Sequence, residues 1–297
     1  MIRFFTLLAA LWFAGAAGAA AHGDGADEQC SARLAPPGRV SLDLADPLSG
    51  AASAEAFELE LRNISDEGCR FTLAVEEGRR GGGLRRRSGA ELAFRIARDA
   101  AGAEVLFDSR QPSAGPRAAF RSPRRNLRLF LIVHPGDAPR AGAYSADVRV
   151  TLRNAQNDLV DQASLELEAQ VPEQVQAFIS GASQLGGAYA LLDLEELTTG
   201  EIGHATLRIR STSDVSIKFD SEHEGRLTRA QGGQITYGLS ADGAPVDLRQ
   251  GGRHGYGVEA SIPLTAREID LQVRVGDTTR APAGEYRDRI TITVTAQ

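Results

Sequence analysis

The sequence predicts an all-β protein built as a sandwich. Short runs, such as 57–62 and 148–152, alternate apolar and polar residues as half-buried strands do. Clusters of Gly, Pro and Asp separate these runs, and no long helical pattern lies between them. Short strands at regular spacing, bounded by turn residues, are typical of a β-sandwich.

The N-terminus has the pattern of a targeting segment. A basic start at residues 1–3 is followed by an apolar stretch at 4–13 and by small residues at 15–21. The Ala19-Ala20-Ala21 triplet before His22 fits a cleavage site. We therefore expect a secretory signal peptide over 1–21 and an exported mature chain. No later apolar run is long enough to span a bilayer.

Cys30 and Cys69 are the two cysteines of the chain. In an exported protein this number predicts one disulfide. The bridge would tie the first strand to its sheet, and its loop of roughly 40 residues would be worth about 3–4 kcal/mol. A metal pair is disfavoured because neither cysteine has a second cysteine or a histidine at ligand spacing. The net charge of −6 argues against a general nucleic-acid binder.

Four segments of the first half recur in order in the second half. The segment 42–50 matches 192–200, 59–71 matches 207–219, 92–105 matches 235–248, and 140–152 matches 282–294. The offset drifts from 150 to 142 residues, and the main step falls on a longer arginine-rich loop in the first copy. Such order indicates two copies of one sandwich, joined near 170–176. We expect domains over 22–172 and 173–297.

The two copies differ at their ends. After Leu152 the first copy continues through an Asn157-Asp158 turn into one more alternating run, at 163–169. The second copy lacks that last run, so we expect its sandwich to lack the final strand. An incomplete sandwich exposes apolar core and unpaired backbone groups, and a strand from another chain can complete it. The alternative is a sandwich closed in some other way, with fewer strands.

The closing residues carry a family resemblance. A Gly-x-Tyr-x-Asp motif precedes alternating apolar positions, at Gly284, Tyr286, Asp288, Ile290, Ile292 and Val294. This pattern resembles the end of spore coat protein U domains, the subunit fold of archaic (Csu-type) chaperone–usher pili. A strand ending in a turn from Ser221 to Gly225 is also similar to that family.

The resemblance covers most of 175–297. It is weaker over 30–170, where Gly142, Tyr144 and Asp147 match with a slippage of one residue. The second copy departs from the family in having no cysteine.

The resemblance implies immunoglobulin-like sandwiches, the second lacking its final strand, and a groove along Ile290, Ile292 and Val294 that receives a neighbouring pilin's strand. It also implies a periplasmic chaperone and an outer-membrane usher as partners. The acidic segment before Cys30 has no apolar alternation, so the chain is expected to accept a strand without donating one. That polarity suits a two-domain tip adhesin at the cell surface. The alternatives are a periplasmic pilus chaperone and an unrelated two-domain secreted or periplasmic binding protein.

Two basic loops of the first copy are candidate ligand sites. Arginine forks suit anionic surfaces, phosphates or acidic glycans. A solvated loop is the alternative interpretation, and so is hydrophobic binding through Leu84, Phe120 or the segment 47–57. One loop contains Arg79, Arg80, Arg85, Arg86 and Arg87, and the other contains Arg121, Arg124 and Arg125.

Enzymatic chemistry has no support in the sequence. The five histidines show no paired spacing for a metal, and no Gly-x-Ser-x-Gly or phosphate-loop motif is present. We therefore expect a protein without catalytic residues, metal or cofactor.

Overall fold

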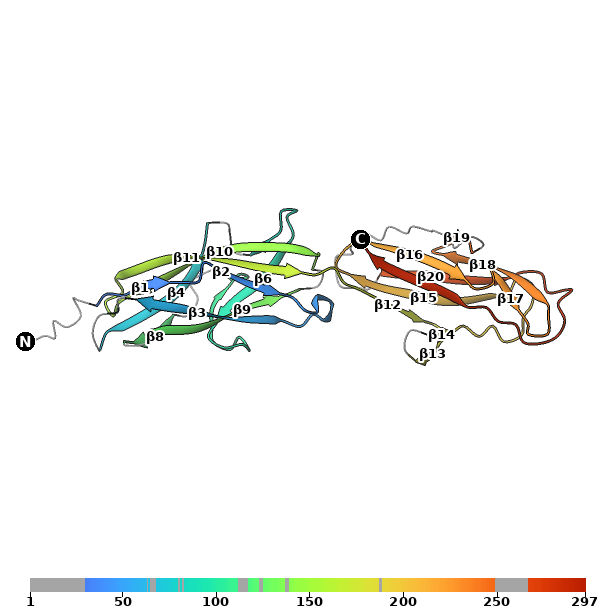
Figure 1. Ribbon diagram of the computed structural model, residues 1–297, viewed down its shortest axis with the longest axis horizontal. Helices are drawn as coiled ribbons and strands as arrows, with labels where there is room; N and C mark the ends of the chain where they lie inside the picture. Colours follow the sequence, from blue (N-terminus) through green and yellow to red (C-terminus); the bar gives the residue numbers. More distant parts are fainter. Residues whose placement is uncertain are drawn as a thin grey trace, which may run out of the picture.

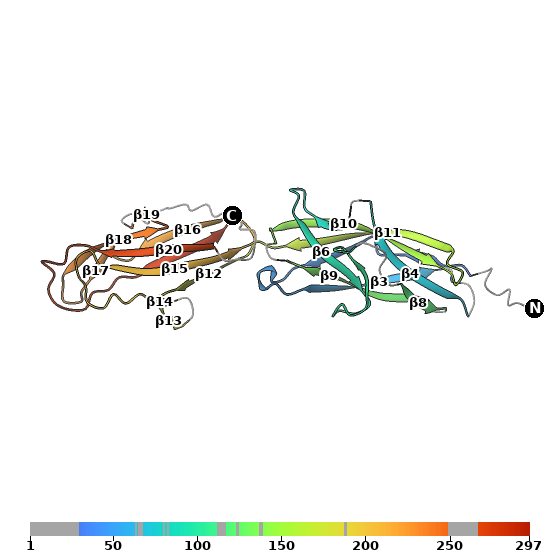
Figure 2. The ribbon, with the colours of Figure 1, turned by 180° about the vertical axis from the view of Figure 1, so that it is seen from behind.

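The computed structural model describes residues 30–62, 64, 68–79, 81, 83–111, 117–122, 125–136, 139–186, 189–248 and 267–297. The predicted signal peptide lies outside these residues. Within them the chain is all β, apart from a three-residue 3-10 helix at Pro47–Ser49, and no helix is long and apolar enough to cross a membrane. The predicted fold class is confirmed. Figures 1 and 2 show two lobes end to end, with most strands running along the long axis.

The N-terminal sandwich has two layers. Its back sheet runs β1 (Arg33–Ala35), β3 (Ser53–Arg62), β9 (Asn126–His134), β6 (Glu91–Ala97) and β7 (Val105–Asp108). Its front sheet runs β8 (Ala118–Arg121), β4 (Arg70–Glu77), β10 (Gly142–Arg153), β11 (Leu159–Val171) and β2 (Arg39–Asp43). The short β5 (Leu84–Arg85) pairs with both β6 and β10. Pairing is antiparallel except between β2 and β11, which are parallel.

The alternating residues of both sheets meet in one core. Leu59, Leu73, Leu131 and Leu165 are fully buried there. The predicted disulfide is present, with Cys30 joined to Cys69 at the N-terminal end of this sandwich. It fastens the segment before β1, which belongs to the back sheet, to the start of β4 in the front sheet.

The C-terminal sandwich has its own core and repeats most of this order. Its back sheet runs β12 (Val175–Ser180), β15 (Ile202–Ser211), β20 (Arg267–Val275) and β18 (Gln234–Ala241), with β17 (Arg226–Thr228) and β19 (Ala244–Val246) paired to β18. Its front sheet contains β16 (Val215–Ser221) and β21 (Ile290–Ala296). A separate hairpin joins β13 (Ser183–Gly186) to β14 (Tyr189–Leu191).

The predicted repeat is visible as a repeat of strand order. The series β1–β3–β9–β6 corresponds to β12–β15–β20–β18, and β4–β10 corresponds to β16–β21. Residues of β4 and β16 that match in the sequence repeat do not occupy equivalent positions in the structure. Phe219 faces Ile292, whereas the equivalent Val150 faces Val75 rather than Phe71. The connection from β3 to β4 in the first copy is therefore four residues longer than the connection from β15 to β16 in the second.

The junction between the sandwiches is short and hydrogen-bonded. β11 ends at Val171 and β12 begins at Val175. Thr212 is 1% exposed, and its hydroxyl donates to the Pro172 carbonyl and accepts the Gln174 N–H, both at 2.8 Å. The Ala141 N–H donates to the Thr212 carbonyl at 2.7 Å, which links the two sandwiches directly.

Candidate functional site

The front sheet of the C-terminal sandwich has an open edge. In the N-terminal sandwich β10 lies between β4 and β11 and pairs with both. The equivalent β21 pairs with β16 from Val215–Ala296 to Ser221–Ile290. Among the residues that the structure describes, no strand pairs with the opposite edge of β21. That edge presents backbone N–H and C=O groups to which a further strand can bind.

Burial shows the consequence for the core. Val148, Val150 and Leu152 of β10 are at most 1% exposed, because β11 packs its own apolar row beside them. The equivalent side chains of β21 are only partly buried against their core. They are the predicted groove residues Ile290, Ile292 and Val294.

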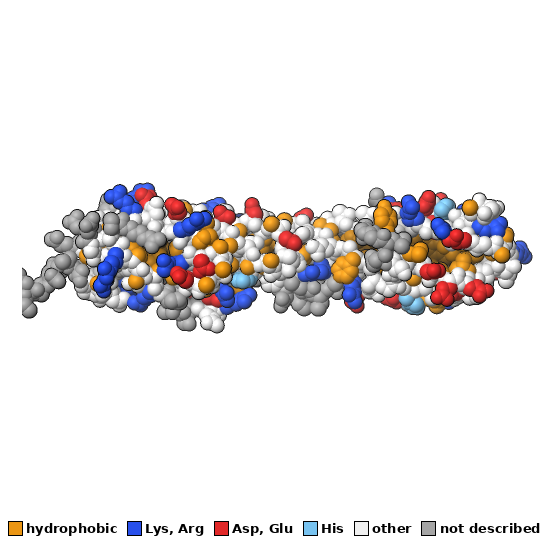
Figure 3. All heavy atoms as spheres, turned by 90° about the horizontal axis from the view of Figure 1, so that it is seen from below, with side chains coloured by type: hydrophobic (Ala, Val, Ile, Leu, Met, Phe, Trp, Pro, Cys, Tyr) orange, Lys and Arg blue, Asp and Glu red, His pale blue; other side chains and the backbone are white. Residues whose placement is uncertain are grey.

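The opposite rim of the opening is β12. Val175 and Ile179 of this strand are partly buried and pack against the same core as the β21 row. β12 and β21 approach each other where the missing strand would lie. Figure 3 shows hydrophobic side chains lining a hollow along this sandwich. We call the space between β12 and β21 the open groove.

The Gly-x-Tyr part of the motif makes the corner that leads into β21. Gly284 has φ +150°, and a Cβ there would lie 2.6 Å from the Arg229 Cδ. The Tyr286 hydroxyl donates to the Pro282 carbonyl at 2.7 Å. Tyr144 makes the same contact four residues back, to the Arg140 carbonyl at 2.8 Å. Both are tyrosine corners of the kind found in immunoglobulin-like sandwiches.

Asp288 then fastens the start of β21 to its neighbours. Its side chain is 3% exposed and accepts the hydroxyl protons of Ser221 and Tyr237, each at 2.6 Å. It also contacts the His223 Nδ1 at 2.9 Å and accepts the His223 N–H at 3.2 Å. Burial opposes ionisation, but these hydrogen bonds outweigh it and lower the pKa of the Asp288 carboxyl. Burial and this carboxylate raise the pKa of Tyr237.

Part of this cluster was not predicted. The turn from Ser221 to Gly225 was identified, and the Gly225 N–H donates to the Ser221 Oγ at 2.8 Å. No sequence motif pointed to His223 and Tyr237, because these residues are distant from Asp288 in the sequence and contact it only in the folded structure. The supposed match at Asp147 is wrong. Counting from the tyrosine corners, the buried Ala146 occupies the position of Asp288, and Asp147 lies on the outer face.

The arginines of the two predicted loops are spread over different parts of the N-terminal sandwich. Arg80 and Arg124 lie outside the described residues. Arg85 faces Ser145, near the start of β10, and pairs with Glu91, while Arg86 lies over Gly142 and Arg87 is exposed. Arg121 and Arg125 lie near the other end of the sandwich, where Arg121 faces Arg70. The Arg79 N–H donates to the Asp147 carboxylate on the outer face of the front sheet.

The apolar candidates for surface binding are corrected by the structure. Leu84 is 0% exposed and Phe120 is 9% exposed, and the Phe120 ring packs against Phe71. Both side chains belong to the core because β5 and β8 direct them inward. Within the segment 47–57, Pro47, Leu48 and Phe57 are buried, and the Leu48 carbonyl accepts a hydrogen bond from Arg210 of the second sandwich.

Within the described ranges, no group of three His, Cys, Asp or Glu side chains could hold a metal ion.

Comparisons with known proteins give distant structural likenesses. No protein-family model matches the chain, and no curated protein matches its sequence. A chain of the CsuC–CsuE chaperone–tip adhesion subunit complex from archaic Csu pili of Acinetobacter baumannii is 14% identical, with a TM-score of 0.49, over 89% of this chain and 98% of that one.

Two further likenesses are weaker. CfaE, the adhesive subunit of CFA/I fimbria of enterotoxigenic Escherichia coli, is 12% identical, with a TM-score of 0.36, over 88% of this chain and 94% of that one. The E. coli chaperone DraB is 13% identical, with a TM-score of 0.26, over 81% and 86%. At these values the likenesses carry no functional argument.

Proposed function

We propose that this chain is a structural and adhesive subunit of a chaperone–usher pilus, and that its open groove accepts a β-strand from a neighbouring subunit. One observation carries the proposal. The apolar row of β21 is only partly buried, whereas the equivalent row of β10 is buried beside β11. A donated strand would do for β21 what β11 does for β10.

The chemistry of such binding is strand addition. The donor's backbone would pair with the free edge of β21, and its alternate side chains would fill the space above Ile290, Ile292 and Val294. In the N-terminal sandwich the sealing strand runs antiparallel to β10, with Leu165, Leu167 and Val171 fully buried. We expect the same direction and a similar apolar alternation in the donor.

The N-terminal sandwich is complete and is the proposed ligand-binding part of a tip subunit. In this proposal residues 22–172 form the adhesive domain and 173–297 the pilin-like domain of spore coat protein U type. The chain would pass through the periplasm with a chaperone covering the open groove. An outer-membrane usher would then assemble it at the cell surface.

A periplasmic chaperone is the rival assignment within the same system. Such a protein needs two complete sandwiches, because it lends a strand instead of receiving one. The partly exposed row of β21 favours the accepting role.

The test supplies the missing strand from the protein's own sequence. A copy of residues 159–171, attached after Gln297 through a short flexible linker, should pair with β21. We expect the C-terminal sandwich to unfold at higher temperature and the chain to remain monomeric. The control extension replaces Leu165 and Leu167 with Ser in the copy only. Equal unfolding temperatures for the two extended chains would count against strand acceptance.

A second test uses assembly itself. Ile292→Asp places a charge on the floor of the open groove, where a donated strand would bury it. We expect loss of incorporation into fibres while the disulfide-bonded N-terminal sandwich stays folded. Unchanged incorporation would contradict the proposal.

A further inference from the structure

Six arginines lie along the outer face of the front sheet in the N-terminal sandwich. Arg149 and Arg153 project from β10, Arg70 from β4 and Arg121 from β8, on the side away from the core. Two more lie beside these strands. We call the set the arginine stripe: Arg70, Arg79, Arg117, Arg121, Arg149 and Arg153.

The strand register fixes the length of the stripe. Arg149 faces Glu76 of β4, and Arg70 lies six residues away on the same strand, which is about 20 Å at the rise of a β-strand. Arg121 faces Arg70 on the next strand, so that two like charges stand side by side. Like charges directly opposite each other destabilise a sheet, so this pairing needs a reason other than folding.

The stripe carries an excess of positive charge. Two carboxylates share this face, Glu76 opposite Arg149 and Asp147 beside Arg79, but within the described part of the chain none of the six arginines forms an ion pair with Asp or Glu. Arg117 and Arg153 instead donate to the side-chain oxygen and the carbonyl of Asn157, at 2.7 and 2.8 Å. Elsewhere exposed arginines do find carboxylates. Arg39 pairs with Glu166 and Glu168, and Arg62 pairs with Glu60.

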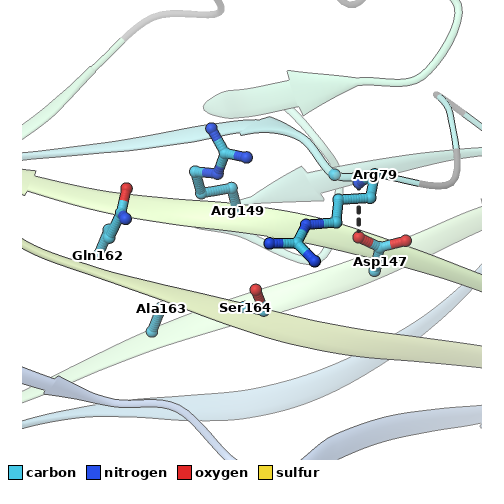
Figure 4. Close-up of a pocket in the computed structure, with 7 residues that line it drawn as sticks. Arg79, Asp147, Arg149, Gln162, Ala163 and Ser164 are labelled. Atoms are coloured by element: carbon cyan, nitrogen blue, oxygen red, sulfur yellow. Dashed lines mark hydrogen bonds between the residues drawn. The ribbon is translucent and has the colours of Figure 1, made fainter.

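One end of the stripe is a small polar hollow, shown in Figure 4. It has a volume of about 140 Å³, and its polar lining side chains are Arg79, Asp147, Arg149, Gln162 and Ser164. Asp147 fixes the backbone of Arg79 by accepting its N–H at 2.7 Å. Gly78 permits this approach, since a Cβ there would lie 2.2 Å from the Asp147 carbonyl oxygen. The Arg79 side chain therefore lies across β10, beside Ser164.

The stripe is narrow. It covers β8, β4 and β10, a width of about 10 Å at the usual strand spacing. Between the arginines stand the small neutral residues Thr72, Ala74 and Ala119, together with the two carboxylates Glu76 and Asp147. The adjoining strands β11 and β2 carry Asp43, Glu166 and Glu168 against the single cation of Arg39. A strip with net positive charge thus borders an acidic one.

We propose that the arginine stripe binds a linear polyanionic saccharide. Its guanidinium groups would hold carboxylates or sulfates by paired hydrogen bonds, and Gln162 and Ser164 would bond to sugar hydroxyls. The inference rests on the proposed function in one respect, namely that the N-terminal sandwich is the ligand-binding part. It names the ligand class and the face that binds it.

The shape of the stripe argues against other polyanions. A membrane surface is broad and would meet the acidic border on β11 and β2. Single-stranded nucleic acid binds through bases stacked on aromatic rings, and no aromatic side chain projects outward from the described residues of β4, β8 or β10. A saccharide chain is narrow and needs no stacking.

The test is calorimetric titration of the full chain carrying the appended strand, with short oligogalacturonate and a short sulfated oligosaccharide as separate probes. We expect at least one probe to bind, and its affinity to fall with rising salt. The two arms distinguish a carboxylated from a sulfated ligand. Neutral maltohexaose, single-stranded DNA and phosphatidylserine vesicles are the comparison probes. Equal or tighter binding of any comparison probe would overturn the proposal, as would absence of binding by both acidic saccharides.

Matched variants locate the site. Arg70→Ser with Arg149→Ser removes two charges from the stripe, and Arg39→Ser with Arg62→Ser removes two paired charges outside it. We expect the first pair to weaken binding by about tenfold or more, and the second by less than about twofold. Equal weakening would indicate general electrostatics and overturn the assignment. Strand acceptance is read separately, from thermal unfolding, so either proposal can fail alone.

Discussion

Ile292 offers a direct measure of what the C-terminal sandwich lacks. The side chain is partly buried against the core, and among the described residues no strand pairs with the free edge of β21 beside it. Truncating a fully buried isoleucine to alanine costs about 2–5 kcal/mol. Because part of Ile292 remains in water, we expect Ile292→Ala to cost about half of this, roughly 1–2.5 kcal/mol, in the unmodified chain.

The appended strand should change that cost. Once a copy of residues 159–171 lies beside β21, Ile292 becomes as enclosed as Val150, which is 1% exposed. We then expect Ile292→Ala to cost the full range of about 2–5 kcal/mol, so that the coupling between strand and side chain is about 1–2.5 kcal/mol. Ile217→Ala is the control, because Ile217 is 2% exposed without the strand. Its cost should be the same in both chains.

The assay is urea unfolding followed by circular dichroism, with hydrogen exchange of the β16 and β21 amides assigning the transition to the C-terminal sandwich. Four proteins are compared for each residue: the original chain and the substituted chain, each with and without the appended strand. If Ile292→Ala costs the same in both backgrounds, the added strand does not cover Ile292. The open groove would then not be a strand-accepting site.

Three other changes test the local devices of the fold. Asp288→Asn should destabilise the C-terminal sandwich by about 2–3 kcal/mol near neutral pH, since it removes charge-assisted hydrogen bonds. Because the folded-state pKa of Asp288 is lowered, its contribution is present above the ordinary carboxyl pKa of about 4 and is lost as pH falls below it. Thermal unfolding against pH should thus show a smaller acid loss for the variant. Replacing Cys30 and Cys69 by Ser opens a bridge between residues 39 apart and should cost the N-terminal sandwich about 4 kcal/mol in urea unfolding, with the C-terminal transition unmoved. Gly284→Ala should lower the unfolding temperature of the C-terminal sandwich, because φ is +150° and the new Cβ would meet Arg229; an unchanged temperature would show that the corner relaxes.

The strand content and the open edge of β21 were predictable, because period-two alternation and a missing repeat segment are properties of the sequence itself. The disulfide was predictable from the cysteine count together with the expectation that the chain is exported. The register of β16 was not. The similar residues around Phe71 and Phe219 suggested that these two phenylalanines are equivalent. The loops before the two strands differ in length, however, and Phe219 occupies the position of Val75.

The candidate sites were less predictable, because they depend on contacts between distant strands. Leu84 and Phe120 read as loop residues, but each sits in a short strand that turns it inward. The basic loops were recognised as arginine-rich, yet half of the arginine stripe comes from strands β4 and β10. Only the register shows that Arg70 and Arg149 share a face with Arg121.

The alignment of the strands with the long axis has a mechanical consequence. Figure 1 shows β10, β11, β12 and β21 running along the direction in which the two lobes follow each other. Ladder hydrogen bonds lie across the strands, so tension along this axis would load a whole row of them in shear at once. A pull across the axis would instead break them one after another. A strand held in the open groove would therefore resist being drawn out lengthwise far better than being peeled from one end.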